Sequence, residues 1–305
     1  MSASARLGLT GLGALVFAVL ALRAAPGGMG AAGWAATAAA WLLAWAFVAT
    51  AAGGRLRPLA PIAFGATVLF LWEATILGAQ VPFVLLPPPS AIWARLVVSG
   101  DVLWADFVQT FVRGALTGYA IGCAAGLLTA VAIDRSPFLQ RGLAPVGAFV
   151  SALPIIGTAP IMVMWFGFDW QSKAAVVVAM TFFPMLVNAT QGLQAADRIA
   201  RDLMRTYAAD YFTTLWKLRL PAAAPFVLNA LKINATLALI GAIVAEFFGS
   251  PTVGMGFRIS TEVGRMNIDM VWASIAVAAL AGSAFYGVVT LLERAATFWR
   301  PAFRR

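Results

Sequence analysis

Long apolar runs dominate the chain, and each is close to the length of a helix that crosses a membrane. Such a helix needs about 20 residues to cross about 30 Å of hydrocarbon. The runs are continuous rather than alternating, which indicates helices, and only helices or closed barrels satisfy the backbone in lipid. We therefore expect an all-α, polytopic transmembrane helix bundle of about 6 to 8 spans. The eight candidate spans are residues 7–22, 34–52, 59–78, 114–133, 143–166, 174–193, 222–248 and 271–292.

The first of these runs, residues 7–22, has the length of a secretory signal peptide. A second apolar run follows it soon, and no clear small-residue cleavage site precedes a soluble domain. We therefore expect the first run to be retained as a span. Because this run is short, a count of six or seven spans with the same C-terminal half is the alternative.

Composition supports the membrane class and argues against catalysis. Hydrophobic residues make up 62% of the chain and charged residues 11%, against roughly 25% charged in soluble domains. Histidine is absent and Cys123 is the single cysteine, which removes the usual general base, an internal disulfide and a thiolate metal cluster. We predict that the chain is not an enzyme, with no catalytic residues, no metal site and no cofactor of its own.

The basic residues predict an orientation. With both termini in the cytoplasm, 14 Lys and Arg residues fall on the inner side and six on the outer side, and Lys232 lies in a span. Basic residues concentrate in cytoplasmic loops of membrane proteins. The net charge of +9 is explained in this way, and since no basic run carries interleaved aromatic residues, we expect no nucleic-acid partner.

Two segments between spans are too long to be simple turns. The outer one, residues 82–112, contains three prolines at 87–89, after which Ser90 is expected to cap a short amphipathic helix along the membrane surface. The inner one, residues 194–221, has the densest charge of the chain together with large apolar residues. That combination suits a docking surface better than a solvated tether, and we expect it to form two short helices.

The inner segment carries a recognisable pattern. Asp202, Leu218, Leu220 and Pro221 have the spacing of the Glu-Ala-Ala, Gly, Ile-x-Leu-Pro pattern, with Ala208 at the position of the glycine. The segment thus resembles the "EAA" loop of ATP-binding-cassette (ABC) importer permeases. Because an alanine there replaces a glycine that lets the chain turn, we expect either a different local turn or backbone strain.

Other stretches are similar to one branch of that family, the permeases for nitrate, aliphatic sulfonates, taurine and thiamine precursors. They include residues 86–93, 220–225, 244–246 and 254–256. The resemblance covers about residues 69–293. It implies a type I importer permease domain at 59–305 with a coupling loop at 194–221, preceded by an extension at 1–58 with two transmembrane helices.

The resemblance also implies partners and site residues. A separate ATP-binding subunit would bind the ATP and dock on the coupling loop, and a periplasmic or lipid-anchored solute-binding protein would deliver the solute. The permease would lie in the bacterial inner membrane, in contact with lipid, as a homodimer. The residues implied in ATPase coupling are Asp202, Arg205, Tyr207, Ala208, Ala209, Asp210, Tyr211, Phe212, Leu218, Leu220 and Pro221, with the three aromatic residues as anchors.

A translocation path is predicted from polar groups and interrupted spans. Pro154, Pro160 and Pro184 would break their spans, and broken spans often line pathways. Glu246 is predicted to shape the outer mouth or to pair with Arg258 or Arg265, and Lys232 to reach the interface. The path residues expected are Met162, Trp165, Phe166 and Glu246.

Glycines at 114, 118, 122 and 126 recur every four residues. They allow close helix packing, either within one subunit or at a dimer seam.

Two other functions compete with the importer permease. An ion-gradient-driven secondary transporter would show inverted repeats and paired mid-membrane acids, and a membrane-embedded enzyme would need a convergent polar site. The sequence shows no clear sign of either. For the transported solute, residues 237–247 look most like permeases for pyrimidine-type thiamine precursors, and aliphatic sulfonates are the alternative.

Overall fold

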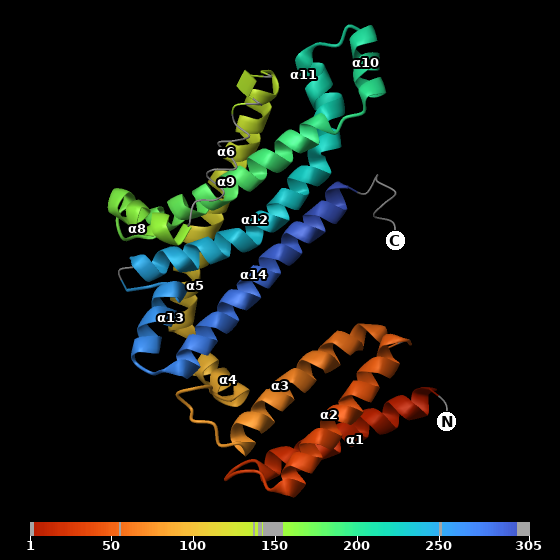
Figure 1. Cartoon of the computed structure of the whole chain (residues 1–305), viewed down its shortest axis with the longest axis vertical. Coiled ribbons are helices and arrows are strands. Elements are labelled where there is room, and N and C mark those ends of the chain that lie inside the picture. Colours follow the sequence, from red (N-terminus) through yellow and green to blue (C-terminus); the bar gives the residue numbers. More distant parts are fainter. Residues whose placement is uncertain are drawn as a thin grey trace. The chain divides into compact units, whose positions relative to one another are not determined.

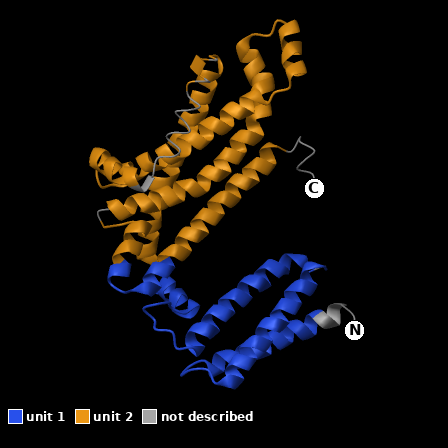
Figure 2. Ribbon diagram, in the orientation of Figure 1, with its two compact units in different colours: residues 1–99, 262–273 blue, residues 100–261, 274–305 orange. Residues whose placement is uncertain are grey.

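The structure is a computed structural model that describes residues 3–54, 56–136, 138–139, 142, 155–249 and 252–297. Every regular element in this part of the chain is a helix, as predicted (Figure 1). The chain forms two compact units, Met1–Ser99 with Glu262–Ala273 and Gly100–Thr261 with Ser274–Arg305 (Figure 2). These units are defined by packing within the chain and do not test the predicted domain boundary at residue 58, which stays a prediction.

Seven helices within the described residues are long and apolar enough to cross a membrane. The eighth predicted span, 143–166, lies partly outside the described residues, which include only its second half as α8 (Ile155–Phe166). The seven segments are Leu7–Ala24, Ala31–Ala52, Arg57–Gly78, Gly100–Asp134, Trp170–Gln194, Tyr211–Phe248 and Ile268–Ala296.

The first unit is built on three apolar helices, α1 (Ala3–Ala24), α2 (Ala31–Ala52) and α3 (Ala60–Gly78), with a 3-10 turn η1 (Arg57–Leu59) before α3. Met29, in the turn between α1 and α2, donates its backbone N–H to the Gly78 carbonyl over 2.9 Å. A Cβ on Gly78 would lie 2.7 Å from the Met29 side chain. The glycine is therefore what lets the end of α3 pack against this turn.

A short helix, α4 (Pro89–Val98), follows α3 in the first unit, and its start differs from the prediction. Ser90 lies inside the helix rather than at its cap. Its backbone N–H and its hydroxyl both donate to the Glu73 carboxylate, at 2.9 and 2.7 Å. Glu73 therefore caps α4 from α3, because an acidic group is stabilised at the N-terminus of a helix.

The first unit also includes the start of α14 (Ile268–Ala296). Arg95 of α4 pairs with Asp269 at 2.7 Å, and the rings of Trp72 and Trp272 meet edge to face with centroids 4.9 Å apart. These contacts join α3 and α4 to the first residues of α14.

In the second unit, two spans are much longer than predicted. The span expected at 114–133 begins at Gly100 and runs without a break through α5 (Gly100–Phe107), a π-helical segment η2 (Val108–Leu116) and α6 (Thr117–Asp134). The span expected at 222–248 begins at Tyr211 and runs through α11 (Tyr211–Thr214), a π-helical turn η3 (Leu215–Arg219) and α12 (Leu220–Phe248). The remaining helices are α9 (Trp170–Gln194), α10 (Arg198–Thr206) and α13 (Met255–Gly264).

The expectation that prolines break the spans is wrong for the two described cases. Pro160 lies inside α8 and Pro184 inside α9, which continues for 25 residues. Prolines are tolerated in membrane helices, where local adjustments and neighbouring groups satisfy the freed backbone. Pro154 lies outside the described residues.

The core of the second unit is the packing of α6 and α12 on α9, and the glycine stripe makes it possible. A Cβ on Gly118 would lie 2.6 Å from the Ala174 carbonyl oxygen, and one on Gly126 would lie 2.6 Å from that of Phe182. The stripe therefore packs α6 against α9 within one chain, which decides between the two alternatives for these glycines.

Polar groups inside this core are paired with groups distant in sequence. Asn234 of α12 donates to the Thr181 carbonyl over 2.8 Å and contacts the Cys123 sulfur at 3.2 Å. Lys232 pairs with Glu293 of α14 at 2.8 Å, and both side chains are largely buried. The expectation that Lys232 reaches the interface is therefore wrong, because a carboxylate lies within its reach inside the bundle.

Candidate functional site

The helix α10 stands between α9 and α11 with none of its residues buried. Ile199, Leu203 and Tyr207 are spaced four residues apart and so share one face of the helix. Their exposed fractions are 78%, 54% and 77%. An apolar and aromatic stripe that is open along a charged helix is typical of a binding surface.

Charged residues flank this stripe. Asp202 lies between two arginines, 4.0 Å from Arg198 and 3.5 Å from Arg205. All three side chains are more than half exposed, and such surface ion pairs contribute little to stability. Their carboxylate and guanidinium groups remain accessible, at the rim of the stripe.

The helix α10 ends in a turn that uses a left-handed alanine. Ala208 has φ +53°, and its N–H donates to the Arg205 carbonyl, while the Ala209 N–H donates to that of Met204. This is a Schellman motif, in which glycine normally occupies the left-handed position. Of the two expectations for Ala208, the structure has the strained backbone, at a cost of about 1–2 kcal/mol.

The chain re-enters the bundle at a capped helix start. The Asp210 carboxylate accepts the backbone N–H of Thr213 over 3.0 Å. Hydrogen bonds from the side chain and backbone of Thr213 lower the pKa of Asp210 below its ordinary value, because they stabilise the ionised form. This cap begins the continuous helix that ends at Phe248.

Tyr211 and Phe212 differ in their surroundings. The Tyr211 hydroxyl donates to the Asp134 carboxylate over 3.1 Å, and its ring packs on the core of α6, α9 and α12. Phe212 is 56% exposed. The Arg135 guanidinium lies 4.5 Å from the centre of the Tyr211 ring and 5.3 Å from that of Phe212. Of these two aromatic side chains, Phe212 is exposed and Tyr211 is half-buried. The anchor role of each stays a prediction.

The other predicted coupling residues lie along the same loop. Ala209 is half-buried, whereas Asp202, Arg205, Ala208 and Asp210 are exposed. Leu218 and Leu220 are half-buried and Pro221 is exposed in the first turn of α12. Ile199 was missed, although its spacing to Leu203 and Tyr207 would have identified it as part of the stripe.

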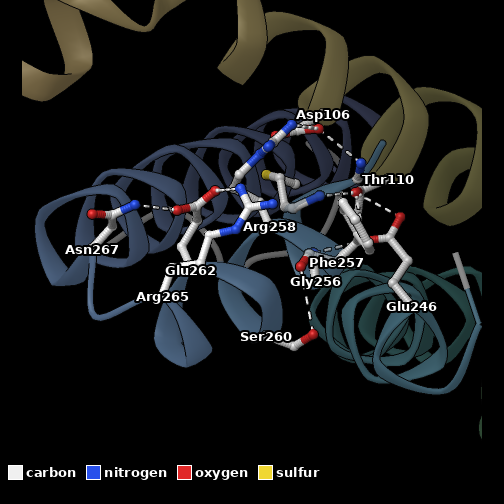
Figure 3. Close-up of polar contacts among 12 residues, drawn as sticks. Asp106, Thr110, Glu246, Gly256, Phe257, Arg258, Ser260, Glu262, Arg265 and Asn267 are labelled. Atoms are coloured by element: carbon white, nitrogen blue, oxygen red, sulfur yellow. Dashed lines mark hydrogen bonds and ion pairs between the residues drawn. The ribbon is translucent and has the colours of Figure 1, made fainter. Parts of the chain in front are cut away.

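A second cluster of polar residues lies at the start of α13 (Figure 3). The two Glu246 carboxylate oxygens lie 2.8 and 2.9 Å from the Thr110 hydroxyl, and one of them accepts the Gly256 N–H over 2.7 Å. Asp106 accepts the Gly254 N–H and the Arg258 guanidinium, both over 2.8 Å. These side chains satisfy the backbone N–H groups that a helix start leaves without partners.

The expected pairing of Glu246 with Arg258 or Arg265 is therefore wrong among the described residues. Arg258 pairs with Asp106 and Arg265 with Glu262, while Glu246 binds Thr110 and Gly256. The backbone at the start of α13 offers Glu246 a partner that the sequence alone does not reveal.

The other predicted path residues do not join this cluster. Met162 packs with Ala159, Val176 and Ala245 where α8, α9 and α12 meet. Trp165 and Phe166, at the end of α8, are exposed. A role of these residues in translocation stays a prediction.

Comparison with known proteins identifies relatives of the chain. A family described as "Binding-protein-dependent transport system inner membrane component" matches residues 122–298. A probable ABC transporter permease protein of Haemophilus influenzae is 29% identical over 221 residues, which are 72% of this chain and 89% of that protein. The formylaminopyrimidine transport permease protein ThiX of Halalkalibacterium halodurans is 29% identical over 244 residues, 80% of this chain and 97% of that protein.

The fold also has a solved counterpart. A chain of the MetNI methionine ABC transporter, in an inward-facing conformation, matches with a TM-score of 0.53 and 18% identity over 67% of this chain and 98% of that chain. At this identity the likeness concerns the fold alone. It agrees with the predicted type I importer permease fold.

Proposed function

The chain belongs to the family of binding-protein-dependent transport system inner membrane components, and we propose that α10 is the surface on which a separate ATP-hydrolysing subunit docks. The chain is thus a multi-pass permease of a bacterial inner membrane, part of an ABC importer. The observation that carries the docking proposal is the exposed stripe of Ile199, Leu203 and Tyr207 on a helix with no buried residue.

An amphipathic helix that lies in a groove of its partner fits this geometry. The stripe would supply the apolar contact, with Tyr207 as its aromatic anchor, since exposed tyrosines are frequent binding hot spots. Asp202 and Arg205 would contribute polar contacts at the rim. The EAA-like spacing from Asp202 to Pro221 supports the same assignment.

The energy for transport would come from the partner subunit. The sequence has no Gly-x-x-x-x-Gly-Lys-[Ser/Thr] phosphate loop, so ATP would bind to the ATPase subunit, and we propose that this chain has no catalytic activity and no cofactor. Closure of two ATPase subunits would move two docking helices together and rock the spans between outward and inward states.

Two ATPase subunits imply two permease subunits, for which a C2 homodimer is the simplest arrangement. Because the stripe from Gly118 to Gly126 is already used against α9, the contact between the subunits would use another face of the chain.

For the solute, we propose a pyrimidine-type thiamine precursor that is delivered by a solute-binding protein. The likeness of residues 237–247 to permeases of this kind and the relative ThiX, named a formylaminopyrimidine transport permease, support this choice. Isothermal titration of the cognate binding protein with a formylaminopyrimidine and with an alkanesulfonate tests it. Preferential binding of the sulfonate would replace the proposed solute with its alternative.

The docking proposal is tested with a Leu203→Ser, Tyr207→Ala double variant. Loss of one hot-spot residue costs about 2 kcal/mol or more, which corresponds to a loss of about 30-fold or more in affinity. We expect the variant to insert into the membrane but to lose the ATPase subunit on copurification. Leu280→Ala, which truncates an exposed leucine of α14, is the matched control. Retention of the ATPase by the double variant would refute the docking role, and uptake without any ATPase would favour the ion-gradient alternative.

A further inference from the structure

Arg219 lies near the end of the coupling loop, residues 194–221, which is called the docking loop from here on. There the chain returns to the bundle, and the Arg219 guanidinium joins three helix ends. Its two terminal nitrogens contact the two carboxylate oxygens of Asp134 at 2.5 and 2.6 Å. Its Nε donates to the Leu193 carbonyl over 3.1 Å. Asp134 ends α6, Leu193 lies in the last turn of α9, and Arg219 precedes α12. We call these three groups the clamp.

The clamp is inside the protein, whereas the helix that it supports is outside. The side chains of Arg219 and Asp134 are 15% and 1% exposed. In contrast, no residue of α10 is buried. A forked guanidinium–carboxylate contact fixes orientation as well as distance, so the clamp holds the base of the loop in one geometry.

Further contacts make the hold of α6 on the loop broader. Asp134 also accepts the Tyr211 hydroxyl, and Arg135 lies over the Tyr211 ring. The end of α6 therefore contacts the helix that begins at Tyr211 at two places, Tyr211 and Arg219. These residues are the two ends of the segment formed by α11 and η3. Between them, Leu215 is buried in the core of the unit.

We propose that Arg219, held by Asp134, is a positioning residue that makes the base of the docking loop move as one body with α6 and α9. A push on α10 is then passed to the spans instead of being absorbed by bending at the base. This inference rests on the proposed docking role of α10 but concerns transmission rather than docking. For equilibrium binding, coupling between two sites is typically worth a factor of about 5 to 150 in affinity, and we take a loss of that order as the scale for transmission.

The test separates transmission from docking by measuring three quantities in reconstituted transporter: copurified ATPase, ATP hydrolysis, and solute uptake per ATP. For Arg219→Gln and for Asp134→Asn we expect the ATPase to remain bound and to hydrolyse ATP, while uptake per ATP falls about tenfold. The Asp134→Asn, Arg219→Gln double variant should be no worse than the worse single variant, because both substitutions break one contact.

Lys217→Gln is the matched control, since it removes an exposed positive charge from the same π-helical turn. It should keep wild-type uptake per ATP. If Arg219→Gln does not accumulate in the membrane, Arg219→Lys takes its place, because lysine keeps the charge but cannot form the forked contact.

Three results would overturn the inference. The first is uptake per ATP at the wild-type value in the clamp variants. The second is an equal fall of uptake per ATP in Lys217→Gln. The third is loss of the ATPase from the Arg219 variant, which would make Arg219 part of docking. The docking proposal fails separately, if the Leu203→Ser, Tyr207→Ala variant keeps its ATPase.

Discussion

Charged residues have opposite surroundings in two regions of the second unit, the exposed helix α10 and the polar cluster at the start of α13, whose helices are labelled in Figure 1. On α10, Asp202 is exposed and its ion pairs are 3.5 and 4.0 Å long. At α13, Asp106 and Glu246 are buried, and each accepts hydrogen bonds of 2.7 to 2.9 Å from two residues. A buried charge must be fully paired, whereas an exposed one stays available for a partner.

The largest expected effect comes from removing one buried charge. Asp106→Ala removes the buried carboxylate that accepts both the Arg258 guanidinium and the Gly254 N–H, and breaking a buried, hydrogen-bonded charge contact of this kind should destabilise the protein by about 3–5 kcal/mol. Asp202→Ala, on α10, should cost less than about 1 kcal/mol. Thermal unfolding of both variants in detergent measures the contrast. Equal melting temperatures would remove the distinction between the two regions.

The same contrast explains which parts of the fold the sequence could predict. The apolar runs located the cores of the spans, and the dense charge located the loop that contains the exposed helix α10. The span expected at 114–133 begins earlier, at Gly100, and the added stretch contains the polar residues Asp106, Gln109 and Arg113. Asp106 is accommodated by Arg258, 152 residues away, and Gln109 by Asp169, 60 residues away. A single sequence does not show such distant pairs.

The candidate site shows the same difference between features that depend on local sequence and contacts between residues distant in sequence. The position of the loop and the two alternatives for Ala208, a different turn or a strained backbone, could be predicted because they depend on local spacing and backbone geometry. The different surroundings of Tyr211 could not, because its partner Asp134 lies 77 residues earlier in the chain. The contacts of Arg219 were missed for the same reason, since they lie at the ends of α6 and α9.

A second prediction concerns the tightly packed side of this comparison. In Gly122→Ala, the added Cβ would lie about 3 Å from the α9 backbone at Val178 and against the Thr181 hydroxyl. Such overpacking costs about 1–3 kcal/mol. Gly287→Ala on α14 has nothing within 4 Å of its new Cβ and should gain up to about 1 kcal/mol of helix propensity. A lower melting temperature for the first and an unchanged or higher one for the second are expected. The reverse order would contradict the packing of α6 on α9.

A smaller effect is expected in the exposed turn after α10. Ala208→Gly removes the cost of a left-handed alanine, but the glycine gains freedom in the unfolded chain, so the net stabilisation should be about 0.5–1 kcal/mol. Slower hydrogen exchange in α10, measured by mass spectrometry, would report it. Ala209→Gly, which changes a neighbour without a left-handed backbone, should show no such gain. If both variants exchange at the same rate, Ala208 is not strained.

The smallest effect concerns pH at the cap of the returning helix. Hydrogen bonds from Thr213 lower the pKa of Asp210, so the folded state holds the ionised form more strongly than the unfolded chain does. The cap therefore stabilises fully above the unfolded pKa of about 3.9, and its contribution is lost as pH falls through the lower folded value. In Asp210→Asn, the side-chain oxygen still accepts the Thr213 N–H but does not titrate.

After correction for intrinsic rates, protection of the Thr213 amide should decrease between pH 5 and pH 3 in the wild type and stay constant in the variant. A parallel decrease in both proteins would show that the loss comes from other groups. Because Asp210 is exposed and its cap is local, the loss should stay within α11 and leave the buried cluster at α13 unchanged.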